Sequence, residues 1–264
     1  MSESTNRLCP HALREQIRSG AWTGHTAGRC AGFVQANLVI VPAVHAGSFL
    51  EFCVGNPGPC PLIEVTLPGE SEPRGAAPGA DLRTDLPRYR VYRNGVPQPE
   101  VTDLSAIWRN DLVAFLLGCS FTFEAALQQD GIPVRHLEQG RNVPMYITKI
   151  PCRPARPFKG PLVVSMRPIP DHLVTQAVAI SRRYPLAHGA PVHVGDSHAI
   201  GIADLARPDF GDSVPVNGGE TPVFWACGVT PQVAAIKAHL DLLITHAPGH
   251  MFVTDLSCEE NAGR

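Results

Sequence analysis

The sequence predicts an α/β protein, with a main three-layer α/β domain into which a smaller two-layer α/β domain is inserted. Two observations predict this fold. Short apolar runs alternate with segments of helical period near both ends of the chain, and a strand, strand, helix, strand succession lies between them. The chain has 264 residues, enough for one large core or two smaller ones. We expect residues 1–130 and 200–264 to form the main domain and residues 131–199 the inserted domain.

The first part of the chain predicts alternating helices and strands. Pro10 opens a short amphipathic helix. Residues 36–41 form a continuous apolar run that stops at Pro42, as in a strand buried on both faces. A helix follows Pro42 and is closed by the turn at Gly55, and residues 62–67 predict a second strand. This order resembles a βαβ unit.

A loop, a hairpin and two helices are predicted next. Residues 69–87 are polar and rich in proline and glycine, which indicates a surface loop. Residues 89–93 alternate in polarity and precede Asn94-Gly95, a strong hairpin signal. We expect a helix from residue 105 to residue 117 and, after a break at a glycine, a second helix over residues 121–129.

The rest of the chain supplies the inserted domain and the end of the main domain. Strands are predicted over residues 145–150, 162–166 and 192–194, with a helix over residues 170–183. Further strands are predicted over residues 223–226, 242–245 and 251–254, with a helix over residues 231–240. The chain contains 26 prolines, about twice the usual share of ~5%. Stiff loops between short elements are more typical of an enzyme than of a flexible adaptor.

Composition and motifs exclude several classes of function. The net charge is −2 and no Lys/Arg run occurs, so neither nucleic acid nor a membrane surface is an expected partner. The polar start carries no signal-peptide core, and eight cysteines form no Cys-x-x-Cys pair, which predicts a cytoplasmic protein with reduced thiols. Gly-x-Ser-x-Gly, P-loop and Rossmann glycine motifs are absent, which argues against the commonest hydrolases, NTPases and dehydrogenases.

Two turns at predicted helix starts concentrate special residues. At the first, Cys119 and Ser120 precede a helix that contains Glu124, so free N–H groups can hold a carboxylate while Glu124 transfers protons. At the second, an apolar run halts at Cys227 and a helix begins near Thr230. The structural alternative is that the cysteines are inert buried side chains and Ser120 is only a cap.

The histidines are the next candidates. His188 and His193 lie in a bent loop where one of them can face a cleft as an acid or base, because imidazole titrates near neutral pH. His246 and His250 have the spacing of a helical zinc pair, but the Pro248-Gly249 turn between them breaks any helix, so no metal is predicted. The turn can present these two side chains at a domain seam, or they can simply bond the backbone.

Residues at the entry to the second domain are also candidates for substrate binding. Asn142 can bond a carboxyl or amide group, and the Tyr146 hydroxyl can donate a hydrogen bond. A turn asparagine and an amphipathic core tyrosine explain the same residues equally well. Arg167 is expected to be an ordinary surface residue.

Five ordered segments resemble the D-glutamate cyclase family, whose bacterial members are named as hydro-lyases. The segments are residues 118–124, 142–146, 184–193, 224–232 and 245–255. The resemblance covers almost the whole chain and implies an α/β fold of two interleaved domains. It also implies dehydration of D-glutamate, or of a similar small amino-dicarboxylate, to 5-oxo-D-proline. No catalytic residues are carried over from the family.

Such a lactam-forming reaction needs a base for the amine, an acid for the departing oxygen and a clamp for the α-carboxylate. We expect His188 and His193 to transfer protons, with Glu124 or Glu220 as a second titratable group whose pKa burial raises. No cofactor is predicted, and the sequence leaves homo-oligomer formation open. Two rival functions remain: an amidohydrolase acting on a small lactam, and a non-catalytic subunit that binds 5-oxoproline or an amino acid.

Overall fold

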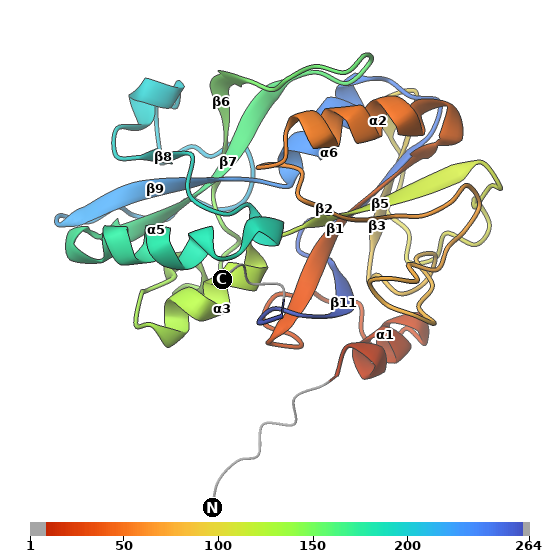
Figure 1. Ribbon diagram of the computed structural model, residues 1–264, viewed down its shortest axis with the longest axis horizontal. Coiled ribbons are helices and arrows are strands. Elements are labelled where there is room, and N and C mark those ends of the chain that lie inside the picture. The colour runs from red at the N-terminus through yellow and green to blue at the C-terminus, as the bar shows by residue number, and fades with distance from the viewer. Residues whose placement is uncertain (1–8, 261–264) are drawn as a thin grey trace, which may run out of the picture.

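The computed structural model describes residues 9–260, which form an α/β fold built on two antiparallel sheets (Figure 1). The α-helices are α1 (Pro10–Arg18), α2 (Ala43–Gly55), α3 (Phe121–Gln129), α4 (Arg135–Glu138), α5 (Val174–Arg182) and α6 (Val229–Lys237). Short 3-10 turns are η1 (Asp171–Leu173), η2 (Pro185–Ala187) and η3 (Ser197–Ile200). The α/β class predicted from the sequence is therefore confirmed.

The first sheet has the strand order β2-β5-β1-β10-β3-β4, and β11 also pairs with β1. Its strands are β1 (Phe33–Pro42), β2 (Leu62–Val65), β3 (Tyr89–Arg93), β4 (Val96–Pro97), β5 (Leu112–Gly118), β10 (Leu243–His246) and β11 (Phe252–Ser257). β5 lies between β1 and β2 and runs antiparallel to both. β1 and β2 are therefore parallel to each other and joined by α2, but another strand separates them, so the expected βαβ unit is split.

One predicted helix is wrong. Residues 112–118 form the strand β5, not the end of a helix, and every residue of this strand is buried. A continuous apolar run of this length is compatible with a buried helix or with a strand covered on both faces, and periodicity cannot separate the two. Cys119 and Ser120 therefore stand at a strand-to-helix turn and not between two helices.

The second sheet has the order β6-β7-β9-β8, formed by β6 (Met145–Pro151), β7 (Pro161–Pro170), β8 (His193–Val194) and β9 (Glu220–Ala226). In sequence it is inserted between two groups of strands of the first sheet. β9 pairs with β7 from Ala226 to Glu220, so the second sheet extends past residue 199. The boundaries of an inserted domain at 131 and 199 stay a prediction.

The largest apolar core lies where the two sheets meet. It combines Val39 and Phe115 of the first sheet with Met166 and Phe224 of the second, and α2 contributes Phe49. A second core fills the opposite face of the first sheet, where Leu82 and Leu86 of the segment between β2 and β3 cover it without a helix. Helices α3 and α5 cover the second sheet through a third core that includes Trp225. Figure 1 shows α2 and α6 on one side of the molecule and α3 and α5 on the other.

Within residues 9–260, the helices are all too short or too polar to cross a lipid bilayer.

Candidate functional site

A cavity of about 350 Å³ opens between the two sheets, where β5 and β9 end and α3 and α6 begin. This volume is in the range of small-molecule sites. The cavity is lined by half of the residues that the sequence predicts for the site, namely Cys119, Ser120, Asn142, His188, Cys227 and His246. These residues are far apart in the chain, so their convergence marks this cavity as the candidate active site.

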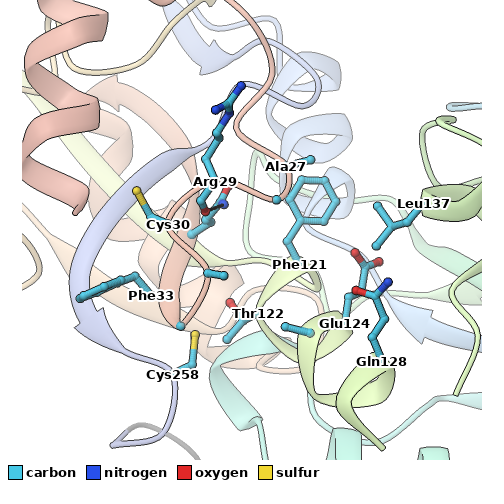
Figure 2. A pocket seen from close by; sticks show the side chains of 15 residues that line it. Ala27, Arg29, Cys30, Phe33, Phe121, Thr122, Glu124, Gln128, Leu137 and Cys258 are labelled. Carbon is cyan, nitrogen blue, oxygen red and sulfur yellow. Dashed lines mark hydrogen bonds between the residues drawn. The ribbon is translucent and has the colours of Figure 1, made fainter. Parts of the chain in front are cut away.

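Two other surface depressions have similar volumes, about 320 and 440 Å³, but neither is lined by any of the predicted residues. A smaller cavity of about 80 Å³ lies behind the first turn of α3 and is lined by Thr122 and Glu124 (Figure 2). Phe121 lines both this cavity and the larger one. The volume of the smaller cavity is less than a quarter of that of the large cavity.

His188 enters the cavity from an unusual backbone conformation, with φ +75°. Its Nδ1 lies 2.9 Å from the carbonyl oxygen of Gly58. A carbonyl oxygen only accepts, so Nδ1 donates and the neutral ring keeps its lone pair on Nε2. Burial lowers the pKa of His188 to about 4, which keeps the ring neutral near pH 7. The neutral ring offers an acceptor at Nε2, and its pKa of about 4 makes it a weaker base than an ordinary imidazole.

Glycine at position 118 fixes the location of His188. A Cβ on Gly118 would lie 1.4 Å from the backbone oxygen of Leu186, so η2 packs directly against the end of β5. His188 follows η2 immediately. Only glycine permits this approach, and the close packing sets where the imidazole lies.

Asn37 ties the two helix starts together. Its Nδ2 donates to the oxygen of Gly118 at 2.7 Å, and its Oδ1 lies 2.9 Å from Nε2 of His246. A Cβ on Gly228 would lie 2.2 Å from Nδ2 of Asn37, so the glycine is required there as well. One buried amide therefore fixes the turn before α3, the turn before α6 and the histidine of β10.

His246 is buried and bonded through both ring nitrogens. Nδ1 lies 2.8 Å from the oxygen of Ala247 and therefore donates, while Nε2 lies 2.8 Å from Nε2 of Gln232. Burial lowers the pKa of His246 to about 4, so the neutral ring accepts a hydrogen bond from the Gln232 amide. A proton added at Nε2 would instead be donated to Oδ1 of Asn37. The site thus has partners for both protonation states of this imidazole.

The helix starts supply the cavity with groups that favour anions. Within residues 9–260, the backbone N–H groups of Ser120 and Gly228 donate to no protein acceptor. Both residues line the cavity, each as the N-cap of its helix, where the helix dipole favours negative charge. The half-exposed Arg90 adds a positive charge, although its Nε also bonds Oε1 of Glu100 at 2.9 Å. Two carboxylate groups can be held in this arrangement.

Arg167 is fully buried, so its assignment to the surface is wrong. Its guanidinium donates to Oε1 of Glu124 and, at 3.0 Å, to Oγ of Ser120. Nε2 of His136 lies 3.2 Å from the same carboxylate oxygen. Burial alone would raise the pKa of Glu124, but Arg167 and His136 outweigh it and the pKa lies below the ordinary value. The expectation of a raised pKa is therefore wrong: Glu124 is an ionised structural partner behind Ser120.

The remaining predicted residues do not line the large cavity. His193 faces the Phe224 ring and contacts the oxygen of Asp196 at 2.7 Å. Glu220 pairs with Arg135, which lowers the pKa of the carboxyl. Their part in proton transfer stays a prediction without support from this geometry.

Three further predicted residues are bonded to the backbone and do not line the cavity themselves. The Tyr146 hydroxyl donates to the oxygen of Leu205 at 2.7 Å. The Thr230 hydroxyl accepts from the N–H of Val163 at 3.0 Å and so ties α6 to β7. His250 donates from Nδ1 to the oxygen of Pro248 at 2.8 Å, as in the structural alternative. The first two therefore have clear structural tasks, and His250 lies beside the site rather than in it.

Sequence reasoning missed Asn37, Arg90 and Gln232, which also line the cavity. Asn37 had a usable signal, because it is the one polar residue in the apolar run of residues 36–41. A buried polar side chain inside a central strand needs partners. Arg90 stands at an exposed position of a strand that alternates in polarity, so its pattern indicates only a solvated face.

Comparison with known proteins identifies the family. The model of the family described as D-glutamate cyclase matches residues 113–255. A protein of Stutzerimonas stutzeri named "Putative hydro-lyase" is 60% identical over 253 residues, 96% of each chain. One of Rubrobacter xylanophilus with the same name is 62% identical over 242 residues, 92% of this chain and 93% of its own. Among solved structures, a nitrogen repressor-like protein of Methanococcus jannaschii aligns with 90% of this chain and 92% of its own at 8% identity, but its TM-score of 0.40 supports no inference.

The family match covers more than half of the chain and contains all of the predicted site residues. The two bacterial relatives extend the similarity to nearly the full length of both chains. The chain therefore belongs to the D-glutamate cyclase family, and its enzyme class is that of the carbon–oxygen lyases.

Proposed function

We propose that the large cavity binds D-glutamate, or a similar small amino-dicarboxylate, and converts it to 5-oxo-D-proline with loss of water. The observation that carries the proposal is the position of His188, which lines a cavity bounded by two helix starts and whose Nε2 has no hydrogen-bond partner among residues 9–260. Two anion-binding positions and one base are what a dicarboxylate with a reacting amine requires.

Binding in the proposal uses the free N–H groups of Ser120 and Gly228, one for each carboxylate of the substrate. Arg90 and Asn142 add a charge and an amide at the same cavity. Charge that develops on the γ-carboxyl oxygens during attack is offset by N–H groups that are already in place, so little reorganisation is needed.

Proton transfer in the proposal centres on His188. Two protons leave the substrate ammonium group and both end on the departing oxygen, so the reaction needs a shuttle and no net proton. Neutral His188 takes a proton from the amine, the nitrogen attacks the γ-carboxyl carbon, and the resulting imidazolium returns the proton to the oxygen that leaves as water. A second passage completes the transfer.

The proposal is tested by incubating the purified protein with D-glutamate or L-glutamate and following both loss of primary amine and formation of the lactam. We expect turnover with the D enantiomer. If the protein instead opens 5-oxoproline to glutamate with no detectable reverse reaction, it is an amidohydrolase. No turnover in either direction, together with tight 5-oxoproline binding by calorimetry, would show a binding subunit and overturn the proposal.

A further inference from the structure

Cys119 and Cys227 occupy equivalent positions in two different sheets. Each follows the last residue of a strand and precedes the N-cap of a helix, β5 and α3 for one and β9 and α6 for the other. Both side chains are buried, at 7% and 8% exposure, and both line the large cavity. The cavity therefore has a thiol at each of its two helix starts.

The separation of the two thiols is fixed by the protein core. Asn37 bonds Gly118, the residue before Cys119, and packs against Gly228, the residue after Cys227. Burial is the main reason that the pKa of Cys119 is raised, and the charge of Cys227 raises it further. Both are free cysteines, and no hydrogen bond joins them within the described residues. Both thiols line the same cavity, and no disulfide joins them.

We propose that these two thiols exchange the α-hydrogen of the bound amino acid and so interconvert its D and L forms. The proposal rests on the proposed function for the identity of the ligand, a small amino-dicarboxylate or its lactam. It adds a second activity, epimerisation at the α-carbon, to a site where cyclisation occurs at the γ-carboxyl group.

The step balances without an oxidant or a reductant. The thiolate of one cysteine takes the α-hydrogen as a proton, and the C–H electron pair stays on the α-carbon, delocalised into its carboxylate. The thiol of the other cysteine then gives its proton to the opposite face of that carbon. The free N–H groups at the helix starts offset the charge that builds up on the carboxylate. Exchange with water at the cavity mouth restores the original protonation of the pair.

The thiols have a pH dependence that the proposal must obey. Burial raises the pKa of Cys119 to about 12 and that of Cys227 to about 11, so thiolate is scarce near neutral pH. The rate of α-hydrogen exchange should therefore rise about tenfold for each pH unit from pH 7 to pH 10. A thiolate formed at so high a pKa is correspondingly strong as a base.

The test is deuterium exchange. The protein is incubated in D₂O with D-glutamate or with 5-oxo-D-proline, the α-proton is followed by NMR, and the enantiomers are separated by chiral chromatography. We expect loss of the α-proton signal and appearance of the L form. Because lactam formation is measured in the same samples, the two proposals fail separately: lactam without exchange overturns the epimerisation, and exchange without lactam overturns the cyclisation.

Single variants give a signature that a merely structural role would not produce. Cys119→Ser and Cys227→Ser should each slow the interconversion of the D and L forms at least a hundredfold. Each variant should retain α-hydrogen exchange for one enantiomer only, and the two variants should retain it for opposite enantiomers. Cys9→Ser at an exposed cysteine is the matched control and should behave as wild type. Thermal melting confirms that the variants are folded. Exchange that survives equally in both variants would assign the base elsewhere and overturn the proposal.

Discussion

At the scale of single residues, the proposed chemistry depends most on His188. Asparagine can replace it with little structural effect, because asparagine tolerates positive φ and its amide can still donate to Gly58. His188→Asn removes the base but not the anchor. We expect kcat for lactam formation to fall by about 10²–10⁴-fold, the usual contribution of a general base. The melting temperature should change little.

The matched control is His193→Asn, which alters a histidine outside the cavity and should leave kcat within about twofold of wild type. Steady-state kinetics of the two variants with D-glutamate decide the assignment. Equal activity of His188→Asn and wild type would remove His188 from the mechanism.

Two buried histidines also make stability depend on pH. The folded-state pKa of His188 and of His246 is about 4, below the 6.5 of an unperturbed imidazole. The unfolded chain therefore binds more protons than the folded one between pH 6.5 and 4. Stability from these rings is fully present above pH 6.5 and is lost as the pH falls toward 4, on the order of 3 kcal/mol for each.

Urea unfolding at pH 7, 6, 5 and 4.5 should show this decline in the free energy of unfolding. His188→Asn should reduce the slope of the free energy of unfolding against pH by about 1.4 kcal/mol per pH unit between pH 6 and pH 4.5. His172→Asn, at an exposed position, is the control and should leave the slope unchanged. A slope that His188→Asn fails to alter would contradict the neutral buried state of this ring.

At the scale of secondary structure, the approach of η2 to β5 positions the loop that carries His188. Gly118→Ala would place a methyl group 1.4 Å from the backbone oxygen of Leu186, so η2 and His188 must move. We expect a loss of stability of about 1–3 kcal/mol and a fall in kcat of more than tenfold. Gly218→Ala, where a Cβ has no atom within 4 Å, is the control for both measurements. A fully active Gly118→Ala enzyme would show that the loop does not determine the position of the base.

The ion pair between β7 and α3 is the second connection between elements near the site. Arg167→Met leaves the carboxylate of Glu124 buried without its main partner, which we expect to cost about 3–5 kcal/mol of stability. Adding Glu124→Gln should recover part of that loss, because no uncompensated charge then remains. A coupling of about 0.5–3 kcal/mol between the two changes, measured by urea unfolding of both single variants and the double variant, is expected. Strict additivity would contradict this interaction.

The strands also show which secondary structure a local sequence pattern can predict. Residues 36–41 and residues 223–226 were predicted correctly as strands, because short apolar runs bounded by proline or glycine have few alternatives. The run that became β5 has no such boundary on its N-terminal side, so its character was settled by pairing with β1 and β2. Strand pairing of this kind joins residues about 75 positions apart, such as Val39 and Phe115. A local sequence pattern carries no information about such a pairing.

At the scale of the whole molecule, the residues of the candidate site were predicted mainly where they stand at turns or next to them. Cys119, Ser120 and Cys227 were found because strand-to-helix turns attract special residues. Asn37 and Arg90 were not, because they belong to regular strands and gain their role from the way the sheets face each other. The buried position of Arg167 depends on Glu124, 43 residues earlier, and is likewise invisible in the sequence.

Because the cavity lies between the two sheets, we expect ligand binding to be coupled to the stability of the whole fold. Both sheets contribute to the cavity, so a ligand there contacts residues of each and binds only the folded chain. Ligand at a hundred times its Kd stabilises a fold by about 2.7 kcal/mol, which for a chain of this size raises Tm by roughly 5–10 °C. Differential scanning calorimetry with 5-oxo-D-proline measures this shift, and sodium chloride at matched ionic strength is the control. Val233→Phe, which fills the cavity from α6, should abolish the shift while leaving the Tm of the free protein near its wild-type value. An unchanged shift in this variant would place the ligand elsewhere on the molecule.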